Sequence, residues 1–351
     1  MKKLALMMAA ALMAAGCESS ADNSASGNSS ADRVRIGFAM ATVREERWQR
    51  DHDAFKAHCE KMNVECIITV ADNNSSRQAN DIENLLTKGV DVLVIAPQEA
   101  TEAAAMVEKA KAQGVPVISY DRLVNSPNID LYISHQVPVI GRRMAEYALE
   151  RVPKGNYVMV YGASTDNNAH IMKKEQLAVL QPAIDRGDIK IVAEQFITDW
   201  KNDLALNFVE NMLTKMNDDL QAVIVSNDGM AGGVISALDK KGLTGKVLVT
   251  GQDAQIDALQ NIAEGKQSMT VYKAIIPLAS AAVEAAIKLA RKEPLETETF
   301  RNEAINADVR AILLEVVSVD RDNLTTTVIA DGYAKFDDVY KNVPADRRPA
   351  R

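Results

Sequence analysis

Short runs of hydrophobic residues recur along the first part of the chain, and segments with helical spacing of apolar residues separate them. The runs occupy positions 34–41, 64–71, 90–96, 115–120 and 131–134. They are continuous rather than alternating, which is typical of strands buried on both faces. The segments between them have the length of helices, at 47–62, 76–88 and 100–113. Strands that alternate with helices in this way predict right-handed βαβ units and a parallel sheet.

The same pattern starts afresh in the second part of the chain. Strand-like runs occupy 156–161, 189–196, 222–226, 246–250 and 269–272. Helical segments fit 168–183, 202–216, 229–240, 256–264 and 276–291. About 320 residues remain after the N-terminal segment, which suits two domains better than one core. Two similar α/β domains place their strand ends on facing surfaces, and domain interfaces are preferred sites for small molecules.

The region after Lys273 allows two interpretations. It contains the helix 276–291 and a strand-rich run at 309–319. Both elements fit as additions to the second domain. Alternatively, the chain crosses back and gives each domain a late segment. The periodicity of the sequence does not distinguish these topologies.

Short polar motifs follow several of the predicted strands. They are Tyr120-Asp121-Arg122, Asp166-Asn167-Asn168, Ser226-Asn227-Asp228, Gly251-Gln252-Asp253 and Tyr272-Lys273. Ligands of open parallel α/β sheets bind just beyond the carboxyl ends of the strands, so we expect these motifs to converge on one cleft. Asp, Asn, Arg and Lys side chains supply the donors and acceptors that several hydroxyl groups need. The Asp and Asn residues are also good helix N-caps, and we expect Asp228 to cap the helix that begins near Gly229.

The N-terminus has the features of a secretory signal at residues 1–16. Two lysines precede a short apolar stretch, and small residues end it at Gly16. The stretch is too short to cross a bilayer as a stable helix. Cys17 follows, and Ala14-Ala15-Gly16-Cys17 resembles a bacterial lipoprotein box, with Ala14 where Leu is most common. The alternative is a secreted protein with an incidental cysteine.

A lipidated Cys17 would tether the protein to a membrane. Residues 17–32 are then a lipid-anchored linker, because 18–32 lack large apolar side chains and favour a flexible chain. The formal charge of −8 excludes a general nucleic-acid binder, which needs a basic surface. Cys59 and Cys66 either form a disulfide, which export permits, or are small buried hydrophobic residues. The cysteine and histidine spacing does not match a zinc site, and we expect neither a metal nor another cofactor.

Taken together, the motifs resemble the bacterial periplasmic D-xylose-binding proteins, the substrate-binding components of ABC sugar transporters. The match runs from Glu46-Arg47-Trp48-Gln49 to Met269-Thr270-Val271-Tyr272-Lys273 and includes the five polar motifs. Two positions depart from the family. Ser134-His135-Gln136-Val137 stands where Asp-Asn is common, and Ala41-Thr42 replaces an acidic pair.

The resemblance implies a fold class, which is α/β with two doubly wound parallel-sheet lobes joined by a three-strand hinge. It favours the topology in which the chain crosses back. The N-terminal lobe then comprises 33–137 and 274–307, and the C-terminal lobe comprises 138–273 and 308–342. Residues 343–351 are expected to form a frayed tail.

The resemblance also implies which residues contact a sugar. They are Arg47, Asp121, Arg122, Asp166, Asn168, Trp200, Asn227, Asp253 and Lys273. Arginine offers several donors in a fixed fork, and a carboxylate accepts strong hydrogen bonds from hydroxyl groups. The indole of Trp200 can stack on the apolar face of a pyranose. We expect Trp48, in the first turn of an amphipathic helix, to be structural.

These features predict a non-catalytic receptor of the periplasm or cell envelope. It would bind a monosaccharide, D-xylose or a related aldose, by closing its lobes, and deliver it to a membrane ABC permease. We expect a monomer. One alternative is a sensor that presents the bound sugar to a membrane signalling protein. Another is an exported glycosidase that uses two of the cleft carboxylates.

Overall fold

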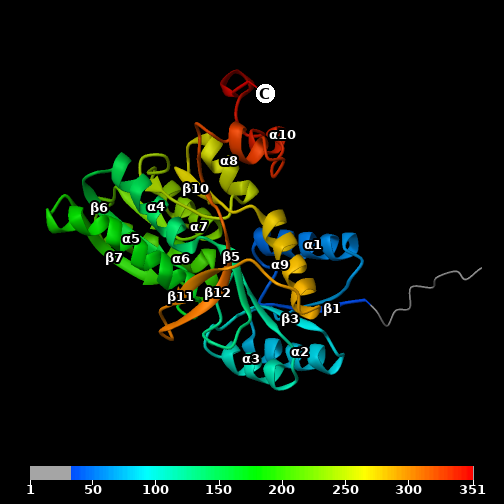
Figure 1. The fold of residues 1–351 in the computed structure, drawn as a ribbon. Coiled ribbons are helices and arrows are strands. Elements are labelled where there is room, and N and C mark those ends of the chain that lie inside the picture. The colour runs from blue at the N-terminus through cyan, green and yellow to red at the C-terminus, as the bar shows by residue number, and fades with distance from the viewer. Residues whose placement is uncertain (1–32, 351) are drawn as a thin grey trace, which may run out of the picture. The chain divides into compact units, whose positions relative to one another are not determined.

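The computed structural model describes residues 33–350, and the chain from Val34 onward folds as one unit with two α/β lobes (Figure 1). The predicted signal sequence, Cys17 and the linker up to residue 32 lie outside the described residues. Within residues 33–350, none of the helices combines the length and apolar character needed to cross a membrane.

The first lobe is built on a seven-stranded sheet. Its strands, in spatial order, are β11 (Glu298–Asn302), β12 (Ala307–Leu314), β5 (Leu131–His135), β4 (Val117–Tyr120), β3 (Val92–Ala96), β1 (Arg35–Met40) and β2 (Glu65–Val70). Neighbouring strands are parallel, except that β11 is antiparallel to β12. The central strands β3, β4 and β5 are buried along their whole length, as their continuous apolar character predicts.

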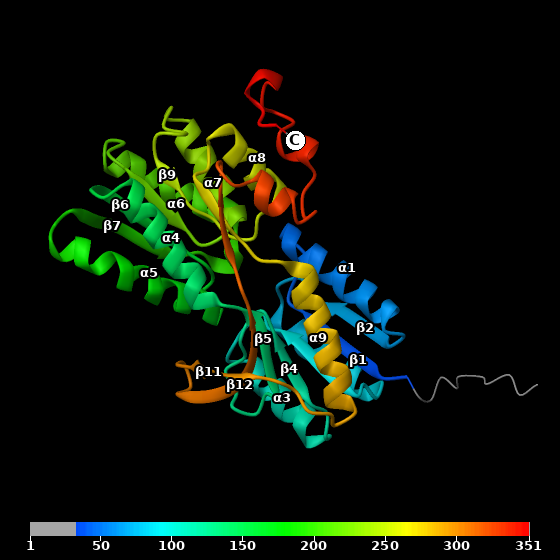
Figure 2. The same cartoon turned by 45° about the horizontal axis from the view of Figure 1, so that its top comes forward.

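Helices cover both faces of this sheet. They are α1 (Glu46–Lys61), α2 (Ser75–Thr87), α3 (Ala103–Ala112) and α9 (Ile275–Ala290). Helices α1 and α9 lie side by side and share one hydrophobic cluster with the sheet, through residues such as Phe55 and Leu278 (Figure 2). Helices α2 and α3 pack on the opposite face, through Ile82, Leu85 and Val107. A disulfide between Cys59 and Cys66 joins the end of α1 to β2.

The second lobe has a four-stranded parallel sheet with a two-stranded extension. The order of the main sheet is β7 (Ile189–Phe196), β6 (Gly155–Tyr161), β8 (Ala222–Val225) and β9 (Leu248–Val249). In the extension, β10 (Met269–Tyr272) is antiparallel to β13 (Val317–Asp320). The helices are α4 (Val137–Arg151), α5 (Asn167–Asp185), α6 (Asn202–Lys215), α7 (Asp228–Asp239), α8 (Ile256–Glu264) and α10 (Phe336–Val339).

Three crossovers connect the lobes, and we call them the hinge. They lie between β5 and α4, between β10 and α9, and between β12 and β13. In the structure the chain crosses back after β10, and α9 packs against α1 in the first lobe. The third crossover differs from the expected boundary at 307/308, because β12 pairs with β5 in the first lobe. The apolar run at 309–319 contains two strands of different sheets, and its composition does not reveal where the chain changes lobe.

Other parts of the structure also go beyond the sequence pattern. The sequence pattern did not predict helix α4, which begins with Val137-Pro138 at the hinge. The antiparallel hairpin β11–β12 was likewise unexpected. Val343, the expected start of a frayed tail, is buried in a cluster with Tyr340. This contact fixes the chain at the point where the pattern predicted that it becomes loose.

Candidate functional site

All nine residues expected to contact a ligand line one cavity between the lobes. Helix α1 and the end of β4 supply the residues of the first lobe. The N-terminus of α5, the turn at 198–200, the N-cap of α7 and the segment after β9 supply those of the second lobe, and Lys273 lies on the hinge. The cavity is also lined by Glu45, Trp48 and Gln252, which were not among the expected residues.

A buried network of ion pairs forms the first-lobe side of the cavity. The guanidinium of Arg47 donates through Nε and Nη2 to Asp51 Oδ2, at 2.9 and 2.8 Å. It also donates through Nη1 to Asp121 Oδ2, at 2.7 Å. Tyr120 donates its hydroxyl to Asp51. Because Asp51 lies in the interior with no exposed surface, the position of Arg47 is fixed from behind by the core of its own lobe.

Lys273 connects this network to the second lobe. Its Nζ lies 3.0 Å from Asp253 Oδ1 and 3.4 Å from Asp121 Oδ2. Burial alone would raise the pKa of Asp121, but the positive charges of Arg47 and Lys273 hold it well below its usual range. Asp121 is therefore a fixed hydrogen-bond acceptor and not a proton donor. Burial raises the pKa of Asp51 in spite of Arg47.

Two polar contacts cross the cleft beside the cavity. Arg122 Nε lies 2.9 Å from Asp166 Oδ2, and Asn168 donates through Nδ2 to the carbonyl of Asp121 at 3.1 Å. Asp166 has a second role, since its Oδ1 accepts from the backbone N–H of Asn168 and caps α5. Burial raises the pKa of Asp166, while Arg122 opposes that shift. One carboxylate thus both caps a helix and reaches the opposite lobe.

The cap of α7 differs from the prediction. Asn227 is the N-cap, and its Oδ1 accepts from Met230 N–H at 2.9 Å. Asp228, the expected cap, lies in the first turn and instead accepts from Gln267 and Thr270 in the interior. Both residues are of types that cap helices, and they are adjacent, so the sequence alone could not show which one is the cap. The extended backbone of Asn227 identifies it as the N-cap.

Both tryptophans of the chain line the cavity, one from each lobe. Trp48 packs in the first-lobe core, as expected, and the guanidinium groups of Arg47 and Arg122 lie over its ring at 4.2 and 5.1 Å. Trp200 lies against the backbone of Gly162, where an added Cβ would be 2.1 Å from the ring. Trp48 was missed as a lining residue because its helical position also explains its burial.

The cavity is almost sealed, and its lining contains both cations and carboxylates. Of the nine expected residues, Trp200 is the most exposed at 8%. They include three cations and three carboxylates, and Glu45 adds a fourth carboxylate to the cavity. Among residues 33–350, the buried atoms without a hydrogen-bond partner include Asn168 Oδ1, Trp200 Nε1 and Glu45 Oε2, all from residues of this cavity. Unpaired buried polar atoms are costly, and a ligand with several hydroxyl groups would satisfy them.

The free space inside is small, about 30 Å³. Pockets for small molecules generally measure about 300 Å³ or more. A ligand therefore has to displace side chains or part the lobes, and the ion pairs that cross the cavity are the contacts that it would replace. In the part of the chain that the structure describes, no three His, Cys, Asp or Glu side chains are grouped to hold a metal ion.

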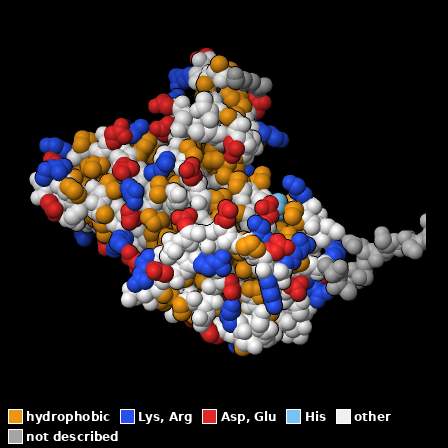
Figure 3. All heavy atoms as spheres, in the orientation of Figure 1, with side chains coloured by type: hydrophobic (Ala, Val, Ile, Leu, Met, Phe, Trp, Pro, Cys, Tyr) orange, Lys and Arg blue, Asp and Glu red, His pale blue; other side chains and the backbone are white. Residues whose placement is uncertain are grey.

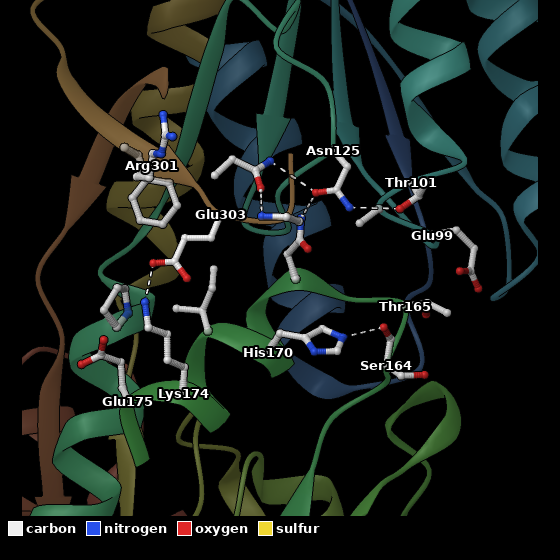
Figure 4. Close-up of a pocket in the computed structure, with 17 residues that line it drawn as sticks. Glu99, Thr101, Asn125, Ser164, Thr165, His170, Lys174, Glu175, Arg301 and Glu303 are labelled. Atoms are coloured by element: carbon white, nitrogen blue, oxygen red, sulfur yellow. Dashed lines mark hydrogen bonds and ion pairs between the residues drawn. The ribbon is translucent and has the colours of Figure 1, made fainter. Parts of the chain in front are cut away.

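A second, larger cavity of about 700 Å³ lies between α5 and the β11–β12 hairpin (Figure 4). Its polar side chains largely pair with their neighbours. Lys174 pairs with Glu303, Asn125 with Thr101, and His170 with the carbonyl of Ser164. Figure 3 shows acidic and basic side chains interspersed over the visible face of the molecule. The second cavity has none of the unpartnered buried atoms found in the first.

Comparison with known proteins agrees with this architecture. A sequence profile described as periplasmic binding protein domain matches residues 36–294. The chain therefore belongs to the periplasmic binding proteins, and it has their type I fold with two lobes.

Two relatives named D-xylose-binding periplasmic protein are similar over most of their length. The protein of Escherichia coli (strain K12) is 40% identical over 305 residues, which cover 87% of this chain and 92% of the relative. The protein of Haemophilus influenzae is 38% identical over 307 residues, with coverage of 88% and 92%. A solved carbohydrate transporter solute binding protein from Chloroflexus aurantiacus, in complex with D-glucose, superposes with a TM-score of 0.81 at 31% identity, covering 87% of this chain and 98% of that one.

Proposed function

We propose that this protein captures D-xylose outside the cytoplasm and delivers it to the permease of an ABC transporter. The observation that carries the proposal is the one cavity in which all nine residues implied by the xylose-binding resemblance come together. The 40% identity to a D-xylose-binding periplasmic protein supports the choice of sugar.

The chemistry of the cavity suits a ring of hydroxyl groups. Arg47, Arg122 and Lys273 donate hydrogen bonds, and the three aspartates accept them. The indole of Trp200 offers an apolar face for the C–H surface of a pyranose. Micromolar affinity requires about 8 kcal/mol, which several charge-assisted hydrogen bonds of roughly 1.5–3 kcal/mol each can supply after the cost of ordering.

Binding would act by closing the lobes. A sugar that contacts both lobes favours the closed arrangement by the contacts it gains there. We propose that the permease recognises this closed form.

The remaining parts of the proposal concern the cell envelope. We propose that a lipid on Cys17 anchors the protein, that residues 18–32 act as its tether, and that the protein works as a monomer. Incorporation of radiolabelled palmitate tests the anchor. The label should appear in the exported protein and disappear in Cys17→Ser, and labelling that survives this substitution contradicts the assignment.

Isothermal titration of the exported Cys17→Ser protein against pentoses and hexoses tests the ligand. We expect D-xylose to bind with micromolar affinity and the other sugars at least about tenfold more weakly, a difference of about 1.4 kcal/mol. Failure of every monosaccharide to bind below millimolar concentration would contradict the proposed function. Hydrolysis of a nitrophenyl xyloside, measured on the same sample, would instead support the glycosidase.

A further inference from the structure

The turn that carries Trp200 has an unusual backbone. Asp199 and Trp200 both have positive φ angles, 52° and 56°. Residues other than glycine visit this left-handed region rarely and usually singly, and a bulky residue there is an outlier. Such conformations persist only where the surroundings hold them, and they cluster at ligand clamps and switches. The contacts of this turn therefore show what holds Trp200 in place.

The second lobe supports the ring of Trp200 by packing, because Trp200 belongs to the hydrophobic core of that lobe, but it gives the backbone of the turn few polar contacts. The backbone N–H of Trp200 donates to the carbonyl of Ile197 at 3.1 Å, and the ring lies against Gly162. Lys201 Nζ is 3.3 Å from Asp199 Oδ2, with 44% of the lysine side chain exposed. Exposed ion pairs contribute little. The indole N–H has no hydrogen-bond partner among the described residues.

Two side chains of the first lobe complete the support. Gln98 donates through Nε2 to Asp199 Oδ1 at 3.1 Å, and Arg44 donates to the carbonyl of Asp199. Gln98 is 4% exposed, and its backbone N–H is held by Gln78 Oε1 at 2.9 Å. Gln78 in turn donates to the carbonyl of Ala96 in the first-lobe sheet. The turn is thus connected to the core of the opposite lobe.

The same region separates two spaces. Glu45 and Trp200 line both the sealed cavity and an outer pocket of about 680 Å³. Arg44 also donates to Glu45 Oε1. Glu45 of the first lobe and Trp200 of the second therefore form one wall of the cavity, and their neighbours Arg44 and Asp199 join the two halves behind it. Parting the lobes would open this wall and remove both first-lobe contacts to Asp199.

We propose that Arg44 and Gln98 are positioning residues that set the indole of Trp200 against the ligand only when the lobes close. Neither residue is among those that line the sealed cavity, so both act through Asp199. Closure of the lobes and stacking of the Trp200 indole on the ligand then occur together. The inference rests on the proposed function, because the sugar drives the closure that brings the two lobes into contact.

Fluorine NMR of the full chain labelled with 5-fluorotryptophan tests this directly, because the chain has two tryptophans. Trp48→Phe and Trp200→Phe assign the two signals. With saturating D-xylose, both signals of the unsubstituted protein should shift. In Arg44→Ala/Gln98→Ala the Trp48 signal should shift as before, while the Trp200 signal stays near its sugar-free position or broadens.

The dissociation constant should rise about tenfold in the double variant, as expected for two lost hydrogen bonds. Arg44→Lys keeps a donor, so its dissociation constant should lie between those of the unsubstituted protein and the double variant. Arg77→Ala/Gln113→Ala is the matched control, since both residues are exposed in the same lobe. The control should leave both signals and the affinity unchanged.

The outcomes separate the two proposals. A Trp200 signal that matches the unsubstituted protein in sugar-saturated Arg44→Ala/Gln98→Ala would overturn the positioning role and leave the proposed function intact. Absence of any xylose-induced shift in the unsubstituted protein would contradict both. Equal loss of the Trp48 and Trp200 shifts at saturation would indicate general unfolding of the site and also overturn the specific role.

Discussion

The two lobes hold their site residues by different means. In the first lobe, Arg47 is locked by the buried carboxylate of Asp51, behind the cavity. In the second lobe, Asp166 and Asn227 are helix caps, so part of each side chain is already used by its own helix. The first lobe therefore presents fixed charges whether or not the lobes meet. The second lobe contributes groups whose final contacts depend on the meeting.

This difference predicts that substitutions in the two lobes affect stability and affinity differently. Substitutions in the first-lobe network should reduce both stability and affinity, because they leave buried charges unpaired. Substitutions in the second lobe that preserve the caps should reduce affinity with little change in stability. The experiments below challenge that contrast, beginning with the largest expected effect.

Arg47→Ala should have the largest effect. It leaves the carboxylates of Asp51 and Asp121 without their main partner, which costs about 3–5 kcal/mol of unfolding free energy. The affinity for D-xylose should fall more than about a hundredfold, equivalent to about 2.7 kcal/mol. Urea unfolding and isothermal titration measure the two losses. Arg47→Lys retains a charge, so its stability and affinity should lie between those of Arg47→Ala and the unsubstituted protein. Arg77→Ala removes an exposed ion pair and should change neither quantity.

Asp166→Asn should separate the helix cap from the contact across the cleft. Asparagine caps a helix as well as aspartate does. The pair with Arg122 joins the two lobes, so parting of the lobes exposes Arg122 to water and does not leave its charge buried, and the free energy of unfolding should change by less than about 1 kcal/mol. The ion pair with Arg122 is lost, and affinity should fall about tenfold to a hundredfold. A loss of stability as large as that of Arg47→Ala would contradict the contrast between the lobes. Asp166→Ala should cost about 1 kcal/mol more, because it also removes the cap.

Gly162→Ala tests the placement of Trp200 from within its own lobe. The new methyl group would lie 2.1 Å from the indole, so the ring must move. We expect about tenfold weaker sugar binding and a loss of about 1–3 kcal/mol in stability from overpacking. Gly232→Ala is the matched control in the same lobe, since nothing lies within 4 Å of its added Cβ. Equal affinities of the two variants would show that the ring position is unimportant.

His135→Phe should have the smallest effect on binding and should show in the pH dependence of stability. Burial, together with the charge of Lys273, lowers the pKa of His135 to about 3, with Arg47 acting in the same direction and Asp121 opposing. A histidine whose folded-state pKa is lowered contributes stability above its unfolded pKa of about 6.5 and loses it as the pH falls toward 3.

Between pH 6.5 and 4.5 the unsubstituted protein should therefore lose about 2 kcal/mol more than His135→Phe. Urea unfolding across this range measures the difference. The low pKa of Asp121 acts only below about pH 4, outside this window, and the other carboxylates are common to both proteins. Parallel curves for the two proteins would show that His135 is solvated in the folded state.

The sequence was informative wherever one local pattern had one structural meaning. Continuous runs such as 92–96 became buried strands, and Gly89, with a φ of +71°, follows the end of α2 as a stop signal. The polar motifs after the strands indicated the cavity, because strand ends of a parallel sheet meet at one edge. All nine implied residues were brought together there.

The sequence was ambiguous where one residue type serves two roles. Trp48 fits both a core and a cavity wall, and it belongs to both. Asn227 and Asp228 are adjacent and both are of residue types that cap helices, so only the backbone geometry shows that Asn227 is the cap. The run at 309–319 changes sheets in its middle, since Val309 packs in the first lobe and Val319 in the second. The hydrophobic pattern of a sequence predicts that a residue is buried, but it does not show in which lobe's core the residue lies.

The third crossover has a consequence for the biogenesis of the protein. Strand β12 pairs with β5, although the sequence of the main second-lobe sheet lies between them. Until residues 275–314 are synthesised, the N-terminal lobe therefore has an unpaired edge at β5, and α1 alone covers the apolar face that it later shares with α9. Unpaired edges invite aggregation. A truncated chain that ends before residue 275 should accordingly be insoluble, and neither lobe can be excised as one continuous fragment.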